Sequence, residues 1–212
     1  MDPSRFIEAI DRQLARRKVE LSTLLLMVKD ENPDPSRLNC LARSAVVLTY
    51  AHWEGFVKQG SSEYVKHVND AKIKVSELKL PFQAAHVSSA FKRAKESEKA
   101  QYLGSLLEEI DRRRGEVFSI SPEKCVDTES NLSSRVFFEI VKGIGLDVLP
   151  LYEMRRAFID QRLVLARNGV AHGQLLSFDA LDVEDRIKGT LKLIDAYADQ
   201  LKDAAVKRYF MK

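Results

Sequence analysis

Cysteine is scarce in this chain, which limits the ways in which its fold can be held together. Only Cys40 and Cys125 occur in 212 residues, far apart in the sequence, and neither belongs to a C-x-x-C pair. We interpret them as reduced thiols of a cytoplasmic protein rather than as a disulfide. A chain of this length can bury a hydrophobic core large enough to be stable without cross-links.

A long hydrophobic run is also missing. The longest strongly apolar stretch, Leu21–Val28, contains Ser22 and Thr23 and is too short to cross a bilayer. Charged side chains occupy the first dozen residues, where a signal peptide needs an apolar segment: Asp2, Arg5, Glu8, Asp11 and Arg12. We therefore expect a soluble protein that makes no membrane contact.

Neither a large excess of charge nor a cofactor motif is present. The net charge is +3, from 34 basic and 31 acidic side chains, so contact with nucleic acid should be local. Neither G-x-x-x-x-G-K-[ST] nor G-x-G-x-x-G occurs. His67 has Glu63 and Asp70 at helical spacing but no second histidine or cysteine, and His86 has no such neighbours. We expect no metal site and no cofactor.

The sequence contains strong helix signals instead. The dipeptide Asp-Pro occurs at 2–3 and again at 34–35, where each pair fits an N-cap followed by proline in the first turn. Apolar residues then recur at helical spacing to about residue 29 and, in the second case, over about 36–68. The second helix is apolar around so much of its circumference that it should be central.

The rest of the chain follows the same pattern. Further helices are expected near 83–97, 99–114, 132–142 and 151–166, and from Asp179 toward the end. The segment 115–131 is polar and rich in turn residues, so it should form an exposed loop or insertion; within it only 117–120 resembles a strand. The prediction for residues 1–212 is a single all-α domain.

Arg167 and His172 are the most promising pair for catalysis. They lie in residues 162–173, which read R-L-V-L-A-R-N-G-V-A-H-G. Histidine can transfer protons near neutral pH, and arginine can hold a phosphate through two hydrogen bonds. Five positions along an α-helix correspond to a rotation of about 140°, so we expect Gly169 to break the helix and let the two side chains converge. On these residues alone, a helix end followed by a loop histidine is the simpler interpretation.

Two short motifs resemble those of a known family. Residues 167–172 match R-N-x-x-x-H, and residues 50–56 read Y-A-H-W-E-G-F. In this order they resemble the HEPN superfamily (higher eukaryotes and prokaryotes nucleotide-binding domains), and the second motif resembles a stand-alone prokaryotic subgroup found among toxin and phage-defence systems. Together with the helical pattern, the resemblance covers most of the chain. It implies an all-α, HEPN-like helical bundle with extra helices.

The resemblance also implies an activity. Members of this kind are metal-independent endoribonucleases. Their homodimers bring the two copies of the R-N-x-x-x-H motif together across a two-fold axis, in one composite active site. RNA supplies the nucleophile, its 2′-hydroxyl, and the products end in a 2′,3′-cyclic phosphate. Arg167 would bind the phosphate, His172 would transfer protons, and Asn168 would support them. The implied partners are RNA, a second copy of the chain, and an antitoxin or another component of a defence system.

Three further residues are candidates for supporting roles. Glu54 lies one helical turn from Tyr50 and is either solvated or a brace for an active-site arginine. Arg156 lies eleven positions before Arg167, which places both on one face of an α-helix, so Arg156 and Arg162 would extend a track for RNA phosphates. A solvated helix surface is the alternative explanation for both arginines.

Two other functions stay open at this point. The first is that of a catalytically inactive HEPN-like module that binds a nucleotide, RNA or a protein partner; such a module would leave RNA intact. The second is that of a helical adaptor without any role in nucleic-acid chemistry. In that case we expect a monomer in which Arg167 and His172 lie far apart.

Overall fold

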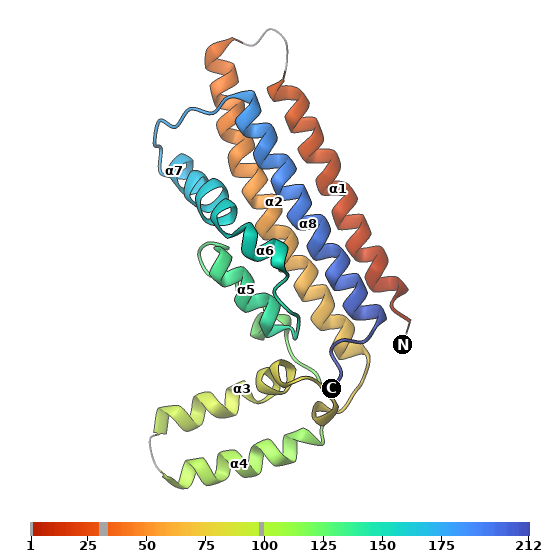
Figure 1. The fold of residues 1–212 in the computed structure, drawn as a ribbon. Helices are drawn as coiled ribbons and strands as arrows, with labels where there is room; N and C mark the ends of the chain where they lie inside the picture. Colours follow the sequence, from red (N-terminus) through yellow and green to blue (C-terminus); the bar gives the residue numbers. More distant parts are fainter. Residues whose placement is uncertain (1, 30–33, 98–99) are drawn as a thin grey trace.

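The computed structural model describes residues 2–29, 34–97 and 100–212 (Figure 1). Its helices are α1 (Ser4–Val28), α2 (Pro35–Asp70), η1 (Val75–Glu77), α3 (Leu80–Ser97), α4 (Ala100–Arg114), η2 (Pro122–Lys124), α5 (Ser134–Gly143), α6 (Pro150–Met154), η3 (Phe158–Leu165), α7 (Ala166–Ala171) and α8 (Ala180–Val206). Of these, η1 and η2 are short 3-10 helices and η3 is a π-helix. The predicted all-α fold is confirmed.

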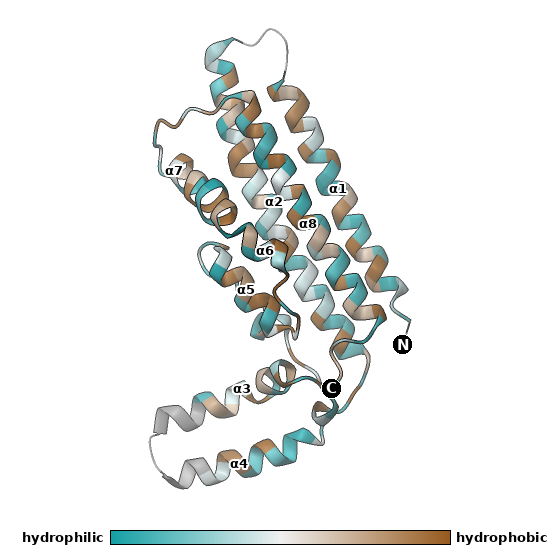
Figure 2. Cartoon of the chain, viewed as in Figure 1, coloured by the Kyte–Doolittle hydropathy of each residue, from teal (hydrophilic) through white to brown (hydrophobic). Residues whose placement is uncertain are grey.

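Three long helices, α1, α2 and α8, pack side by side and form the body of the bundle (Figure 1). Figure 2 shows apolar and polar residues alternating around each of them, as expected of helices with one buried side. Helix α2 also contacts α5 and α7, and it buries Trp53 and Phe56 completely. It is central, as its sequence predicts. None of the helices in the described ranges combines the length and the apolar character that crossing a bilayer would require.

Of the two N-caps predicted from the Asp-Pro pairs, the one at Asp34 is confirmed, and the last helix begins at Asp179 as expected. The Asp34 carboxylate accepts the backbone N–H of Arg37, and that of Asp179 accepts the N–H of Asp182. The first helix differs, because its N-cap residue is Pro3. There Asp2 accepts the N–H of Ser4 at 3.0 Å, so the aspartate stabilises the turn that leads into the helix.

Helices α5, α6, η3 and α7 lie along one side of the long helices (Figure 1). The sequence predicts one helix over about 151–166, but the chain forms α6, a turn at Arg155, and then η3, which continues directly into α7. A π-helix hydrogen-bonds to the fifth residue along and is wider than an α-helix. Positions on either side of η3 therefore do not keep the 3.6-residue period on which predictions from spacing depend.

Helices α3 and α4 form a hairpin that projects from the bundle (Figure 1). Both were expected, although residue 99, the expected start of the second, lies outside the described residues. At the base of the hairpin the C-terminal segment is fixed to the chain just before α3. The backbone N–H of Lys79 donates to the carbonyl of Phe210 at 2.9 Å, and Leu78 and Met211 form an isolated antiparallel bridge.

The segment 115–131 is irregular and mostly exposed, as expected, but the prediction of an exposed loop is wrong at its buried apolar positions. Phe118, Ile120 and Val126 are buried in the main core. The side chain of Asn69 fixes the segment by accepting the N–H of Ile120 and donating to its carbonyl, at 3.1 and 2.8 Å. The strand-like part at 117–120 forms only one isolated bridge, between Val117 and Lys74.

Candidate active site

Arg167 is held in place by three contacts on the side of α7 that faces α2. Its guanidinium carbon lies 5.0 Å from the centroid of the Tyr50 ring. Its Nη1 donates to the Oδ1 atoms of Asn131 and Asn168, at 3.1 and 2.8 Å. These bonds use both hydrogens of Nη1. The other three N–H groups, on Nε and Nη2, donate to no protein acceptor in the part of the chain that the structure describes, so they remain available to an anion.

Tyr50 connects α2 to the loop that carries Asn131. Its ring is buried, and its hydroxyl accepts the backbone N–H of Leu132 at 2.7 Å. Burial raises the pKa of Tyr50, the Leu132 N–H opposes that rise, and the nearby Glu54 carboxylate adds to it. The phenol is therefore neutral at physiological pH. It provides a fixed aromatic face for Arg167 and an acceptor for the loop.

Glu54 lies where the helical spacing predicts, half-buried and on the same face of α2 as Tyr50. Its charge acts on the Tyr50 hydroxyl. No ion pair joins Glu54 to Arg167 among the residues that the structure describes, so a bracing role would be indirect, through Tyr50.

His172 follows the last residue of α7 and is exposed. Its backbone N–H still donates to the carbonyl of Asn168 at 2.9 Å, so the chain is helical up to this position. The turn comes one residue later, at Gly173, where φ is +76°. The Gly173 N–H bonds to the Val170 carbonyl and the next N–H to the Gly169 carbonyl, which is a Schellman C-cap.

The expected helix break at Gly169 is therefore wrong. Gly169 lies inside α7 and is buried, and its missing side chain leaves room for the returning loop. A Cβ there would lie 2.6 Å from Cδ1 of Leu176 and 2.8 Å from Oε1 of Gln174. Because the helix is continuous, Arg167 and His172 differ in direction by about 140° within one copy. One chain by itself does not aim both side chains at the same point.

The other three histidines, His52, His67 and His86, are buried. His52 belongs to the Y-A-H-W-E-G-F motif but faces α1. There its Nδ1 lies 3.4 Å from Nη1 of Arg17 and its Nε2 lies 3.5 Å from a Glu20 oxygen. Since arginine only donates, Nδ1 is the acceptor and the imidazole is neutral. Of the four histidines, all of them described, only His172 can reach a substrate at the surface.

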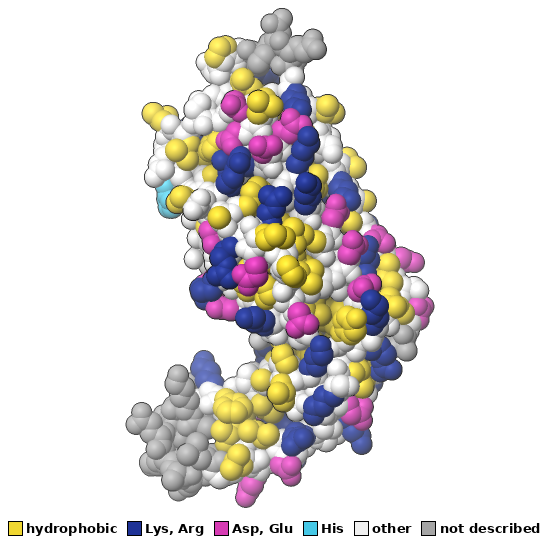
Figure 3. All heavy atoms as spheres, in the orientation of Figure 1, with side chains coloured by type: hydrophobic (Ala, Val, Ile, Leu, Met, Phe, Trp, Pro, Cys, Tyr) yellow, Lys and Arg dark blue, Asp and Glu magenta, His cyan; other side chains and the backbone are white. Residues whose placement is uncertain are grey.

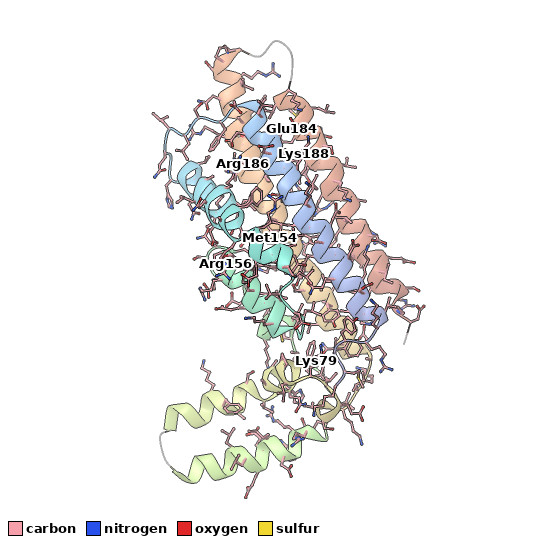
Figure 4. The ribbon with its side chains drawn as sticks, viewed as in Figure 1. Lys79, Met154, Arg156, Glu184, Arg186 and Lys188 are labelled. Atoms are coloured by element: carbon pink, nitrogen blue, oxygen red, sulfur yellow. The ribbon has the colours of Figure 1, made fainter. Side chains whose placement is uncertain are left out.

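Arg156 and Arg162 do not join Arg167. Arg156 pairs with Glu153 at 2.6 Å and lies 4.9 Å from the centroid of the Phe138 ring, so it stays beside α6 and α5 (Figure 4). Arg162 pairs with Asp182 of α8. Because η3 separates Arg156 from Arg167, the expectation that the eleven-residue spacing keeps them on one face is wrong.

The structure adds two residues that the sequence did not single out. Tyr50 was noticed only as part of a motif, and Asn131 lies in a segment expected to be exposed. Both owe their place to contacts between distant parts of the chain, which periodicity does not reveal. Within the described residues, no group of three or more His, Cys, Asp or Glu side chains is placed to hold a metal ion.

This fold places the R-N-x-x-x-H motif at the end of a helix, against the helix that carries the Y-A-H-W-E-G-F segment. The protein is thus an all-α helical bundle of the HEPN type. Residues 12–203 match the model of the RiboL-PSP-HEPN family, a range that includes both motifs. The chain belongs to this family. Comparisons with curated proteins and with solved structures give no match.

Proposed function

We propose that this protein is a metal-independent endoribonuclease that cleaves RNA by attack of the 2′-hydroxyl on the adjacent phosphate. The observation that carries the proposal is the state of Arg167, fixed by Tyr50, Asn131 and Asn168 with three N–H groups free. Five positions further on, at the end of the same helix, the chain presents its exposed imidazole, His172.

The chemistry assigned to these residues balances without a further reactant. A histidine accepts the proton of the 2′-hydroxyl as that oxygen attacks phosphorus, and Arg167 stabilises the charge that accumulates on the non-bridging oxygens. The bond from phosphorus to the 5′-oxygen then breaks, and an imidazolium donates a proton to the leaving oxygen. The products are a 2′,3′-cyclic phosphate and a free 5′-hydroxyl.

We propose further that the active unit is a homodimer. Arg167 and His172 point in different directions within one copy, so a second copy would complete the site. Apolar side chains around the motif support this proposal, because Leu165 and Leu175 are 65% and 91% exposed and Leu48 lines a groove together with Val170. Two-fold symmetry would supply two arginines and two histidines, so that one imidazole acts as base and the other as acid.

The biological setting follows from the resemblance to toxin and defence proteins. We propose that the ribonuclease is an effector of this kind and that a partner, such as an antitoxin, restrains it. Expression of the wild-type chain should then arrest growth, and His172→Ala should relieve the arrest. Equal growth with both chains would contradict this role and leave the biochemical proposal to its own test.

Incubation of structured RNA with the purified protein in EDTA tests the activity. Wild type should produce fragments with 2′,3′-cyclic phosphate ends, and Arg167→Ala and His172→Ala should each reduce the rate by about 100-fold to 10,000-fold. Arg114→Ala, which removes an exposed arginine of α4, is the matched control and should cleave like wild type. Intact RNA with the wild-type protein would favour the non-catalytic binding module instead.

A further inference from the structure

A small pocket between η3 and α8 is lined mainly by cationic side chains. Its volume is about 280 Å³. Its lining consists of Arg155, Phe158, Arg162, Asp185, Lys188, Gly189 and Lys192. Four of these residues are basic and one is acidic. We call it the basic pocket.

The floor of the pocket is formed by a close contact between a glycine and an aromatic ring. A Cβ at Gly189 would lie 2.5 Å from Cζ of Phe158, so only glycine lets this ring lie against α8. The guanidinium of Arg155 in turn lies 5.6 Å from the centroid of the Phe158 ring. The floor and one of the four cations are therefore fixed before any ligand arrives.

Two other cations are oriented by carboxylates that do not fully neutralise the pocket. Arg162 pairs with Asp182, which also pairs with Arg186, and Lys188 pairs with Glu184, which also pairs with Lys29. Each carboxylate is thus shared between two cations.

Arg155 and Lys192 form no ion pair within the described ranges. Figure 4 shows Glu184, Arg186 and Lys188 on the upper part of α8, and Figure 3 shows Lys and Arg side chains there among Asp and Glu side chains. A concave surface with an excess of one charge raises the local concentration of ions of opposite charge.

We propose that the basic pocket binds a backbone phosphate of the RNA that Arg167 and His172 cleave. The inference takes its ligand, RNA, from the proposed function. The pocket is small enough to suit a single tetrahedral anion, for which the Arg155 guanidinium offers a planar pair of donors. Asp185 can accept a hydrogen bond from a ribose hydroxyl next to that phosphate, whereas the Asp and Glu side chains of an acidic peptide carry no such hydroxyl.

The position of the pocket suits a substrate that continues to the motif. Arg155 precedes Arg167 by twelve residues in one nearly continuous helical stretch, which is no more than about 18 Å along the axis. An RNA strand bound in the basic pocket can therefore reach the end of α7. In this arrangement Arg155 and Lys192 provide the additional contacts with the backbone, the expected Arg162 lies beside them in the lining of the pocket, and the expected Arg156 lies outside it.

The test measures RNA binding without cleavage, in full-length protein that carries His172→Ala. Fluorescence anisotropy with a labelled single-stranded RNA, repeated over a range of KCl concentrations, compares Arg155→Gln/Lys192→Gln with Arg114→Gln/Lys124→Gln. The control pair also removes one arginine and one lysine, both exposed and outside the pocket. The pocket variant should bind at least about tenfold more weakly, and its slope of log K against log[salt] should be smaller by about 1 to 2.

Equal affinities and slopes for the pocket variant and its control would overturn the proposal. So would binding of labelled poly-L-glutamate that Arg155→Gln/Lys192→Gln abolishes while the affinity for RNA stays unchanged, because the pocket would then bind acidic protein. Lys192→Glu alone, at an exposed position, should weaken binding in the same direction and guards against misfolding of the double variant.

Failure of this inference is distinguishable from failure of the proposed function. In the chain with His172 intact, Arg155→Gln/Lys192→Gln should raise KM by at least about tenfold with little change in kcat, because the pocket binds the strand away from the reacting phosphate. If the wild type cleaves RNA and KM is unchanged in the variant, the proposal for the basic pocket is wrong and the proposed ribonuclease activity stands. Pocket-dependent RNA binding by a wild-type protein that does not cleave RNA supports the pocket and overturns the ribonuclease.

Discussion

The guanidinium of Arg167 lies over the ring of Tyr50, 5.0 Å from its centroid, and this contact joins the two sequence motifs of the chain. A planar cation on the face of an aromatic ring keeps its edges free for hydrogen bonds. One edge faces Asn131 and Asn168, and the other is open. The motif on α2 therefore contributes to the site by positioning the arginine of α7.

Removing the aromatic face should lower activity through this contact. Tyr50→Leu leaves a bulky apolar residue but no ring, and a partly buried cation–π contact is worth about 0.5–2 kcal/mol. If that energy is lost from the transition state, kcat/KM for RNA cleavage should fall by about 2-fold to 30-fold. Unchanged kcat/KM in a folded Tyr50→Leu protein would show that the ring does not position Arg167.

Tyr50→Phe separates the ring from its hydroxyl. It keeps the face under Arg167 but removes the acceptor for the Leu132 N–H, which then lies buried without a partner. Such a loss costs about 1–3 kcal/mol, so urea denaturation should show lower stability. Below the unfolding transition this variant should cleave RNA at nearly the wild-type rate.

The two substitutions of Asn131 should have different effects. Asn131→Ala removes one acceptor and loosens Arg167, for an expected loss of up to about tenfold in kcat/KM. Asn131→Asp instead places a carboxylate 3.1 Å from Nη1, where it would compete with the RNA phosphate for the same cation. Steady-state cleavage should therefore show a larger KM for Asn131→Asp than for Asn131→Ala. The reverse order would mean that Arg167 does not bind the phosphate.

Much of the fold follows from local sequence. The Asp34 cap, the start of the last helix near Asp179, the central α2 and the all-α class depend on interactions within a few residues or on one dominant period, so a single sequence reveals them. The π-helix η3 was not predicted, and its Phe158 packs against Gly189, thirty-one positions away. A contact between residues so far apart leaves no local pattern in the sequence. The incorrect prediction that Arg156 and Arg167 share one helix face came from missing the π-helix.

The sequence allowed the residues of the candidate site to be proposed, but not their geometry. Arg167, Asn168 and His172 stand in a recognisable motif, and Glu54 lies beside Tyr50 as its helical spacing predicts. Gly169 was misjudged because a glycine near a helix end can serve either a turn or a close packing contact, and the turn uses Gly173 instead. To predict the contact of Asn131 with Arg167, one would have to know that the hydroxyl of Tyr50 fixes the residue after Asn131, Leu132.

Stability should depend on pH through His52. Burial lowers the pKa of His52 below its usual 6.5, and the neighbouring Arg17 charge lowers it further against the opposing effect of Glu20. The unfolded chain therefore takes up a proton near pH 6.5 while the folded chain does not. The free energy of unfolding should be constant above that pH and fall as the pH drops toward the lower pKa of the folded state.

Urea denaturation at several pH values checks this expectation. His52→Gln removes the titrating group and should flatten the decline below about pH 6.5. Some decline should persist, because burial also lowers the pKa of His67. A steeper fall in His52→Gln than in wild type would contradict the assignment of a neutral, buried imidazole.

The C-cap of α7 should respond to substitution of its glycine. Gly173 has φ at +76°, a conformation that costs a residue with a side chain about 1 kcal/mol or more, so Gly173→Ala should destabilise the protein by that amount. Gly104→Ala in α4 is the contrasting control. That glycine is exposed and helical, with nothing within 4 Å of its added Cβ, so alanine should stabilise the helix by up to about 1 kcal/mol. In urea denaturation, a lower free energy of unfolding for Gly173→Ala and a higher one for Gly104→Ala would confirm where the chain turns after His172.

Dimer formation should depend on the apolar side chains next to the motif. Leu165 is 65% exposed two positions before Arg167, and a charge there would have to be buried if a second copy covers this surface. Leu165→Asp should therefore give a monomer in analytical ultracentrifugation and lose RNA cleavage, with an unchanged circular dichroism spectrum. Val206→Asp, at an exposed valine in the last turn of α8, should remain dimeric and active. A Leu165→Asp monomer that still cleaves RNA would show that one copy holds a complete site and that Arg167 and His172 do not need a partner.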